Sequence, residues 1–347
     1  MNLKSIVTLA FAGTVSLGAM AGAYKVNVPM GADEDGAMAF LVNYDDGSKV
    51  DSVLVADGAA VFEGDIDAPV LVRLLVDGNR MGSFVVEPGE TVYDMETHEA
   101  RGTVLNDRMS EFGKKMNGLA MEYRSLSGDD DATNVKRRQI EGEYDAAIQS
   151  AMKENIDNPF GYMLFLESAY GMSLEELKAM IDKNPSLKKY KRVTGLVAAA
   201  ENKASTQPGA MFKDFEITYG DGTSKKLSDY VGKGKYTLVD FWASWCGPCI
   251  RETAVIKDIY NEYGPKGLEV LGVAVWDEPE NTKGAIEKHQ LPWPQIINAQ
   301  TVPTELYGIS GIPCIIIFGP DGKILSRDKQ GDALRADVKA AMEGLLK

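Results

Sequence analysis

The hydrophobic pattern divides the chain into three regions, and the first reads as strands. Between Tyr24 and His98, short apolar or alternating runs are separated by Asp-Gly, Pro-Gly and related turn signals, which is typical of β-strands. The predicted strands are Ala37–Tyr44, Val50–Ala56, Ala59–Phe62, Val70–Val76, Gly82–Val86 and Thr91–Met95. Their regular spacing predicts an antiparallel β-sandwich-like domain or a small barrel over residues 24–100.

Helical spacing replaces this alternation after about Arg101. Asn106 is the expected N-cap of the first helix, and Ser173 with Glu176 forms a capping box for a later one. The predicted helices cover about 106–123, 131–155, 160–170, 173–184 and 186–203. Polar and small residues at 204–209 then predict a linker, so residues 101–206 are interpreted as a helical segment with its linker.

Strands and helices alternate in the third region, residues 207–347. The predicted strands are Tyr236–Ala243, Leu268–Val275, Gln295–Asn298, Cys314–Phe318 and Lys323–Leu325. The predicted helices are Ile250–Tyr263, about Glu280–His289 and Ala333–Leu346. This alternation predicts an α/β sheet covered by helices.

Residues 1–23 have the pattern of a secretory signal peptide. Lys4 is their only charge, an apolar run follows, and small residues allow cleavage after Ala21 or Ala23. An uncleaved N-terminal anchor is the alternative. No cysteine stands directly after this segment, which argues against a lipid anchor. No later stretch is long and apolar enough to span a bilayer. We therefore expect an exported periplasmic or cell-envelope protein that is not an integral membrane protein.

Composition narrows the function classes. The chain of 347 residues has 44% hydrophobic and 25% charged residues and a net charge of −14. Residues 24–100 alone carry 4 basic and 16 acidic residues. We interpret this acidity as a solvated surface, with a cation-binding or partner-steering role as the alternative. No segment supplies a basic face for nucleic acid. His98 and His289 are too far apart in the chain to suggest metal ligands, and we predict neither a metal nor a cofactor.

The strongest chemical signal is Trp245-Cys246-Gly247-Pro248-Cys249, between a predicted strand and a predicted helix. A thiol at a helix N-terminus meets unpaired N–H groups and the positive end of the helix dipole, so it can ionise near neutral pH. The two-residue spacing lets the second sulfur close a disulfide with the first. The alternatives are half of a zinc site and a permanent structural disulfide.

This region resembles the thioredoxin-like proteins, and specifically the exported TlpA/ResA-type thiol-disulfide oxidoreductases. The resemblance covers about residues 207–347. It rests on three stretches, namely the run from Val239 to Cys249, Gly311-Ile312-Pro313, and Gly319-Pro320-Asp321-Gly322. More loosely, residues 24–206 resemble the β-rich accessory region that precedes such domains in Bacteroidota proteins. The resemblance implies a thioredoxin fold and a dithiol redox centre.

Roles for the acidic residues and the cysteines follow from this resemblance and from their position. Cys246 would be an exposed attacking thiolate, and Cys249 would resolve the mixed disulfide. Asp240 lies within an apolar strand, so its pKa is expected to rise; in thioredoxins the matching aspartate relays the proton of the resolving cysteine. Glu252 matches an acidic position that tunes the cysteine pair in ResA-type proteins. A glutamate that only complements the helix dipole is the alternative.

The resemblance also implies a surface that binds the partner. Pro313 would be a cis proline facing the cysteines, and the backbone of Ile312 would pair with an extended substrate segment. Trp245, Gly247 and Pro248 would complete this surface, with Trp242 in the core.

Cys314 departs from the pattern, because relatives commonly carry a residue without a thiol here. We interpret it as a buried inert thiol, with a third redox participant as the alternative.

The sequence thus predicts an exported thiol-disulfide oxidoreductase that reduces protein disulfides. Its partners would be protein thiols and disulfides together with a membrane or periplasmic electron donor. Two alternatives are an envelope-interaction protein with a regulatory redox pair and a thiol peroxidase, although the Thr-x-x-Cys pattern of the latter is missing. The partner's identity, the oligomeric state and the purpose of residues 24–206 do not follow from the sequence.

Overall fold

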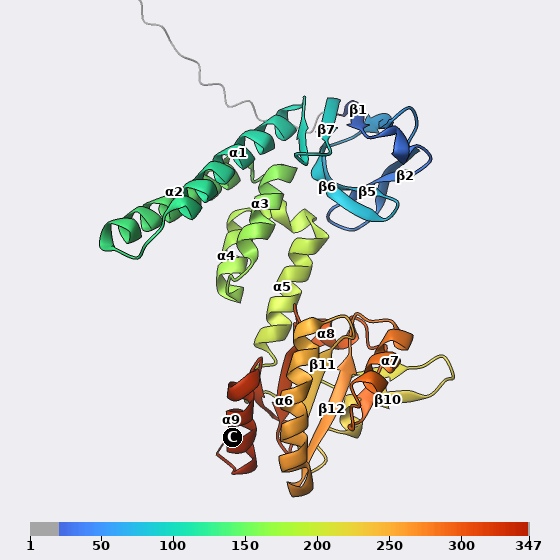
Figure 1. The fold of residues 1–347 in the computed structure, drawn as a ribbon, viewed down its shortest axis with the longest axis vertical. Helices are drawn as coiled ribbons and strands as arrows, with labels where there is room; N and C mark the ends of the chain where they lie inside the picture. Colours follow the sequence, from blue (N-terminus) through green and yellow to red (C-terminus); the bar gives the residue numbers. More distant parts are fainter. Residues whose placement is uncertain (1–20, 346–347) are drawn as a thin grey trace, which may run out of the picture. The chain divides into compact units, whose positions relative to one another are not determined.

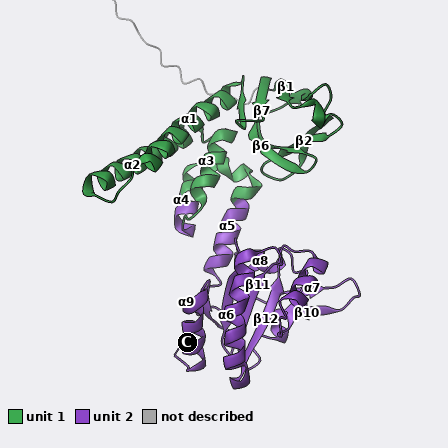
Figure 2. Cartoon of the chain, viewed as in Figure 1, with its two compact units in different colours: residues 1–172, 180–193 green, residues 173–179, 194–347 purple. Residues whose placement is uncertain are grey.

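The computed structural model describes residues 21–345, so most of the predicted signal peptide lies outside the described residues. The chain divides into two compact units (Figure 2). The first runs to Met172 and resumes over Met180–Val193; the second comprises Ser173–Ala179 and everything from Thr194 onward. Within residues 21–345, no helix is both long and apolar enough to cross a membrane.

The first unit begins with two four-stranded β-sheets that enclose one core (Figure 1). In spatial order, one sheet is β4 (Ala59–Ile66), β1 (Gly22–Pro29), β7 (Gly89–Asp94) and β8 (Glu99–Arg101). The other is β3 (Lys49–Leu54), β2 (Met38–Asn43), β5 (Val70–Val76) and β6 (Asn79–Val86), and a short 3-10 turn covers Ala32–Glu34. The predicted β-rich fold is confirmed, with one difference: β1 pairs parallel with β7.

Strand β1 was missed by the sequence interpretation, although its pattern contains the signal. Tyr24, Val26 and Val28 alternate with polar residues and are buried, which is the period-2 pattern of a half-buried strand. Gly22 and Ala23 already pair with β4. Cleavage after Ala21 would leave this strand intact, whereas cleavage after Ala23 would remove its first two residues.

Helices follow the sheets as predicted, with shifted bounds. They are α1 (Val104–Ser125), α2 (Asp131–Asn155), α3 (Pro159–Ala169), α4 (Leu174–Lys183), a 3-10 turn (Pro185–Lys189) and α5 (Lys191–Ala204). The predicted capping box of α4 is present, since the side chains and backbone N–H groups of Ser173 and Glu176 bond reciprocally. The single helix expected over 186–203 is interrupted at Tyr190.

The prediction of Asn106 as an N-cap was wrong, because Thr103 occupies that position. Asn106 lies in the first turn of α1 with its side chain buried. Its Oδ1 accepts a hydrogen bond from the Val85 N–H at 2.9 Å, and its Nδ2 donates to the Val85 carbonyl at 2.8 Å. The residue therefore fastens α1 to strand β6.

The second unit is built on a five-stranded mixed sheet in the order β13-β12-β11-β14-β15. Its strands are β11 (Tyr236–Trp242), β12 (Leu268–Ala274), β13 (Gln295–Ile296), β14 (Cys314–Phe318) and β15 (Ile324–Arg327). The first three are parallel, and β14 runs antiparallel to both β11 and β15. Such nearly continuous apolar strands are expected where both sheet faces are covered.

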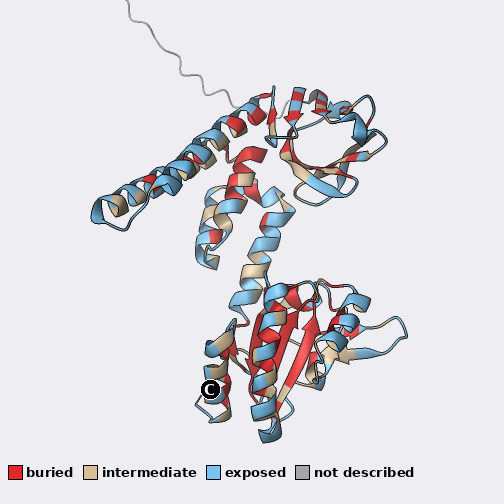
Figure 3. Ribbon diagram, viewed as in Figure 1, coloured by how far each residue is buried: buried red, intermediate tan, exposed pale blue. Residues whose placement is uncertain are grey.

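Both faces of this sheet are covered (Figure 3). On one face, Leu238, Ile315 and Ile317 pack against apolar residues of α6 (Gly247–Tyr263) and α9 (Gly331–Met342). The other face packs against residues from β9 (Glu216–Thr218), a 3-10 turn (Leu227–Asp229) and α8 (Val302–Tyr307). The remaining elements are β10 (Ser224–Lys226), a 3-10 turn (Gly264–Lys266) and α7 (Pro279–Lys288). The β9–β10 hairpin and α8 were not predicted, because three to six residues are too few to show a period.

The predicted linker, residues 204–209, is held by hydrogen bonds at Thr206. Thr206 is fully buried, and the buried guanidinium of Arg327 donates from Nη1 to the Thr206 carbonyl at 3.0 Å and to the Tyr307 carbonyl at 3.2 Å. Gly308 approaches the end of α5 so closely that a Cβ there would lie 2.2 Å from the Ala199 carbonyl oxygen. The end of α5 is therefore an integral part of the second unit.

We expect Arg327→Leu to lower the free energy of unfolding of this unit by about 1–3 kcal/mol, because it leaves the buried Thr206 carbonyl without a donor. All four tryptophans lie in the second unit (Trp242, Trp245, Trp276 and Trp293), so tryptophan fluorescence during urea denaturation isolates its transition. Lys203→Ala is the matched control, because that ammonium is half exposed in its ion pair with Asp328 and should contribute little. Equal effects of the two variants would contradict this account.

Candidate redox site

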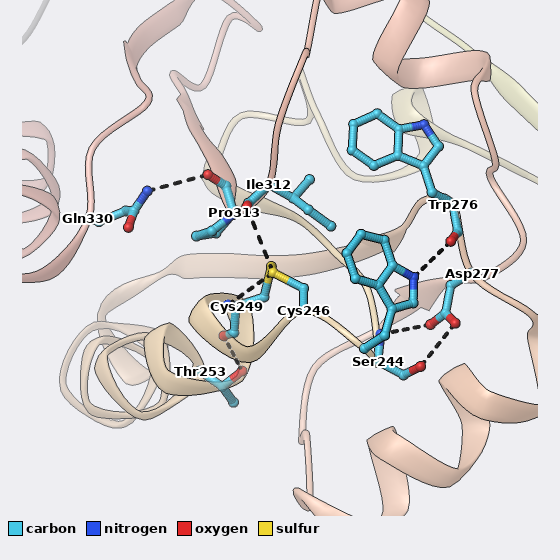
Figure 4. The surroundings of a disulfide bond; sticks show 10 residues. Ser244, Cys246, Cys249, Thr253, Trp276, Asp277, Ile312, Pro313 and Gln330 are labelled. Carbon is cyan, nitrogen blue, oxygen red and sulfur yellow. Dashed lines mark hydrogen bonds between the residues drawn. A yellow bond between two sulfur atoms is a disulfide. The ribbon is translucent and has the colours of Figure 1, made fainter. Parts of the chain in front are cut away.

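The two cysteines lie where β11 passes into α6, at the N-terminus of the helix (Figure 4). Cys246 is the N-cap residue, and its sulfur accepts a hydrogen bond from the Cys249 N–H at 3.2 Å. Pro248 occupies the first turn, where its missing N–H leaves no bond unmade. A thiolate on Cys246 would thus face a backbone donor and the positive end of the helix dipole.

The sulfurs of Cys246 and Cys249 form a disulfide of 2.08 Å. Cys249 is 1% exposed, in accord with its expected lower accessibility, but Cys246 is only 4% exposed in this oxidised form. The expectation of an exposed Cys246 was therefore wrong. The reason is packing, because the disulfide lies in an apolar cluster with Trp242, Ala274 and the partly buried Ile312.

The predicted substrate-facing residues gather around this disulfide. The Ile312–Pro313 peptide is cis, and the Ile312 carbonyl oxygen lies 3.8 Å from Cys246 Sγ. Among the described residues, no backbone–backbone hydrogen bond to Ile312 is found, so pairing with a partner strand would displace none. Gly247 and Pro248 are exposed, and Trp245 is 61% exposed. Trp242 is buried in the core, as expected.

The loop before the cysteines is fastened by residues that the sequence interpretation missed. The buried Asp277 carboxylate accepts hydrogen bonds from the Ser244 N–H at 2.7 Å and from the Ser244 hydroxyl at 2.9 Å. The Trp245 indole N–H donates to the Trp276 carbonyl at 2.9 Å. A signal was present, because Trp276-Asp277 directly follows a buried strand, and the carboxyl ends of neighbouring parallel strands meet at one sheet edge.

Two carboxylates of this region, Asp240 and Glu252, are buried, although the sequence predicted burial for Asp240 alone. Asp240 in β11 is 3% exposed, and its Oδ1 has no hydrogen-bond partner among the described residues. Burial, with a smaller contribution from the charge of Glu252, raises the pKa of Asp240 to about 8. Glu252 is also buried, but its Oε1 accepts a hydrogen bond from the Gly331 N–H at 2.7 Å, at the start of α9. The two carboxyl groups therefore have different environments.

We expect Glu252→Gln to lower the pKa of Asp240, because the substitution removes a nearby negative charge while leaving an oxygen that can accept from Gly331. The pH–rate profile of disulfide exchange, if Asp240 is its base, should move to lower pH by about 0.5–1 unit. Glu262→Gln, on an exposed turn of the same helix, is the control. An unmoved midpoint would show that Glu252 does not act on Asp240.

Cys314 lies directly after the cis proline and is buried. Its thiol donates to Asp328 Oδ1 at 3.2 Å. Burial, reinforced by the Asp328 charge, raises the pKa of the Cys314 thiol, which disfavours the reactive thiolate. These features favour the interpretation as an inert thiol.

Two family descriptions match the chain. Residues 208–327 match the AhpC/TSA family, and residues 24–109 match a domain of unknown function, DUF4369. Among curated proteins, the thiol-disulfide oxidoreductase ResA of Geobacillus thermodenitrificans is 29% identical over 143 residues, which cover 41% of this chain and 80% of that protein. ResA of Bacillus subtilis is 24% identical over 128 residues, covering 37% of this chain and 70% of that protein.

Solved structures match the same region. The thioredoxin domain of a thiol-disulfide oxidoreductase from Bacteroides vulgatus is 33% identical, over 40% of this chain and 98% of that one, with a TM-score of 0.35. Residues 208–327 form a thioredoxin-like domain, and the curated relatives that match this region are thiol-disulfide oxidoreductases. A thiol:disulfide interchange protein from a Bacteroides species is 34% identical over 40% of this chain and 93% of that one, with a TM-score of 0.36. The resemblance to thioredoxin-like oxidoreductases in residues 207–347 is confirmed.

Proposed function

We propose that the chain is an exported oxidoreductase that reduces protein disulfides, with Cys246 as the nucleophile and Cys249 as the resolving cysteine. The observation that supports this most directly is the Cys246–Cys249 disulfide at the N-terminus of α6, beside a cis proline. The relatives named above are thiol-disulfide oxidoreductases. The substrate class we propose is a disulfide in an extended segment of a partner protein.

The proposed reaction transfers two electrons and two protons to the partner. The Cys246 thiolate attacks one sulfur of the partner disulfide, and the other sulfur leaves as a thiolate that takes a proton from water. Cys249 then gives its proton to the Asp240 carboxylate while its sulfur attacks Cys246 Sγ. The second partner sulfur leaves as a thiolate and takes up a proton from Asp240 or from water, which restores the Asp240 carboxylate or leaves its proton to exchange with solvent. The Cys246–Cys249 disulfide that results must be reduced by an electron donor of the membrane or periplasm.

The partner would bind to the surface around the disulfide, which is formed by Trp245, Gly247, Pro248, Ile312 and Pro313. The peptide groups of Ile312 can add an extended segment by strand-like hydrogen bonds. Because Cys246 is almost covered, the partner's disulfide must approach it over the surface that these residues form.

The direction of transfer is testable with insulin. Thioredoxin-like pairs span about −270 to −120 mV, and the Gly-Pro between the cysteines favours the reducing end. The dithiol form should reduce insulin stoichiometrically in a single turnover, and the equilibrium with glutathione should give a potential near the reducing end. A potential near −120 mV, or no reduction of insulin, would contradict the reductase proposal.

Export and the domain bounds are part of the same proposal. The signal peptide would comprise residues 1–23, and cleavage after Ala21 is favoured because it keeps β1 whole. The proposed domains are then 24–100, 101–206 and 207–347, although the buried Thr206 shows that the last folding unit includes the end of α5. Sequencing the N-terminus of protein recovered from the periplasm tests both export and the cleavage point.

The role of residues 24–206 distinguishes the reductase proposal from the alternative of an envelope-interaction protein with a regulatory redox pair. Under that alternative, a fragment comprising Thr194–Lys347 should retain thiol exchange but fail to complement a deletion strain. If the fragment complements fully, the first unit is dispensable for function. Turnover that depends on peroxide and on Cys246 would favour the thiol peroxidase alternative instead.

A further inference from the structure

The helical hairpin of α1 and α2 carries an apolar groove outside the redox site. The two helices lie side by side, and their surface is mostly exposed over the half nearest the turn (Figures 1 and 3). The groove has a volume of about 440 Å³. Its apolar lining comes from Leu119, Ala120, Tyr123, Ile140 and Tyr144.

The aromatic rings of this groove are unusually accessible. Tyr123 is 38% exposed and Tyr144 is 40% exposed, and Met121 nearby is 69% exposed. Large apolar side chains grouped in this way on a surface mark an interaction site. A hairpin of two helices also gains most of its stability from tertiary packing, which is sparse here, since Met116, Ile140 and Ala147 are the buried apolar side chains between Gly113 and Met152.

The charges beside the groove point to the kind of partner. Arg124 lies on the α1 wall, and Glu141 and Asp145 lie on the α2 wall. None of the three makes an ion pair or a side-chain hydrogen bond with a residue that the structure describes. Opposite charges on the two walls make the face self-complementary, because a two-fold axis brings the α1 wall of one copy against the α2 wall of the other.

We propose that the α1–α2 groove is the interface of a homodimer, in which the hairpins of two copies pack as four helices. Tyr123 and Tyr144 of each copy fill the shared apolar centre, and Arg124 of one copy pairs with Asp145 of the other. The dimer would carry two redox domains.

Sedimentation equilibrium of the purified protein tests this inference. The wild type should show the mass of two chains in the micromolar range, and Tyr144→Glu should raise the dimer dissociation constant about 100-fold or more, because it places a charge in the apolar centre. Tyr170→Glu is the control, since that side chain is 94% exposed at the end of α3 and outside the groove. Circular dichroism should show equal helix content in all variants.

Two further variants separate an interface from a folding defect. Arg124→Glu should weaken the dimer about 10-fold, and adding Asp145→Arg to it should restore affinity to within about threefold, because the charges are exchanged between copies. A wild type that is monomeric at about 100 μM, a concentration well above the dissociation constants of stable dimers, or a dimer insensitive to Tyr144→Glu, would overturn the proposal.

Discussion

Replacement of Cys246 by serine is expected to abolish disulfide exchange, with a loss on the order of 10³-fold or more, because a serine hydroxyl is not ionised at neutral pH and cannot form the mixed disulfide. The measurement is single-turnover reduction of insulin by the dithiol form. Cys314→Ser should stay within about twofold of the wild type, since that thiol is buried and its pKa is raised. If the Cys314 variant lost activity as well, the third cysteine would have to be a redox participant.

Cys249→Ser completes this series with a different outcome. It leaves the nucleophile in place and removes the sulfur that releases the partner, so Cys246 should accumulate in mixed disulfides. These adducts can be isolated from the envelope under non-reducing conditions and identified by mass spectrometry. The double variant with Cys246→Ser and Cys249→Ser is the negative control, because it lacks both sulfurs of the redox pair. If Cys249→Ser gave no more adducts than this control, the assigned roles would be contradicted.

Replacement of Asp240 by asparagine is the second large effect that we expect. The pKa of Asp240 is raised to about 8, so the wild-type resolving step should accelerate as pH rises toward 8 and Asp240 becomes an ionised base. The amide of the Asp240→Asn variant cannot accept a proton, so its rate at about pH 8.5 should fall by roughly 10–100-fold while its rate at about pH 6 changes little. A variant that retained the wild-type pH dependence would exclude Asp240 as the proton relay.

Asp240→Asn should slow the resolving step but raise the stability of the fold. Because the folded-state pKa of Asp240 lies above its unfolded value near 3.8, the folded state binds this proton more tightly, and wild-type stability should fall as pH rises from about 4 to about 8. Asp240→Asn removes this dependence, so its melting temperature should exceed that of the wild type most clearly at about pH 8. Parallel pH dependences of the two melting temperatures would contradict the burial of an ionisable group at this position.

Long periodic segments of the fold could be predicted from the sequence, whereas short ones could not. The strand from Tyr236 was found because it is a continuous apolar run, and the helix at residues 131–155 because its apolar residues recur at helical spacing over many turns. The β9–β10 hairpin and α8 are too short for that, and their positions depend on the sheet that they cover. Asn106 shows a different limit, since its type suits an N-cap but its side chain bonds to Val85 of β6, which lies 21 residues earlier in the chain.

For the redox site, the sequence identified the residues whose types carry the chemistry. These residues lie in the second unit, in or near the junction of β11 and α6, and are Asp240, Cys246, Cys249, Glu252 and Pro313. It did not identify the groups that hold them, such as Asp277 behind Ser244 or Gly331 beside Glu252, because these come from distant segments and have no motif. The burial of Cys246 also depends on packing across several elements, which a local pattern does not contain.

The low solvent exposure of the disulfide should limit its reaction with small thiols in the surrounding solution. Thiol exchange needs the attacking sulfur in line with the bond that it breaks, and a bond with 4% and 1% exposed cysteines offers bulk thiols few productive collisions. The oxidation state of the pair would then be under kinetic control, set by the proteins that can open the site. Such insulation would let it remain out of equilibrium with the small-molecule redox buffer of its compartment.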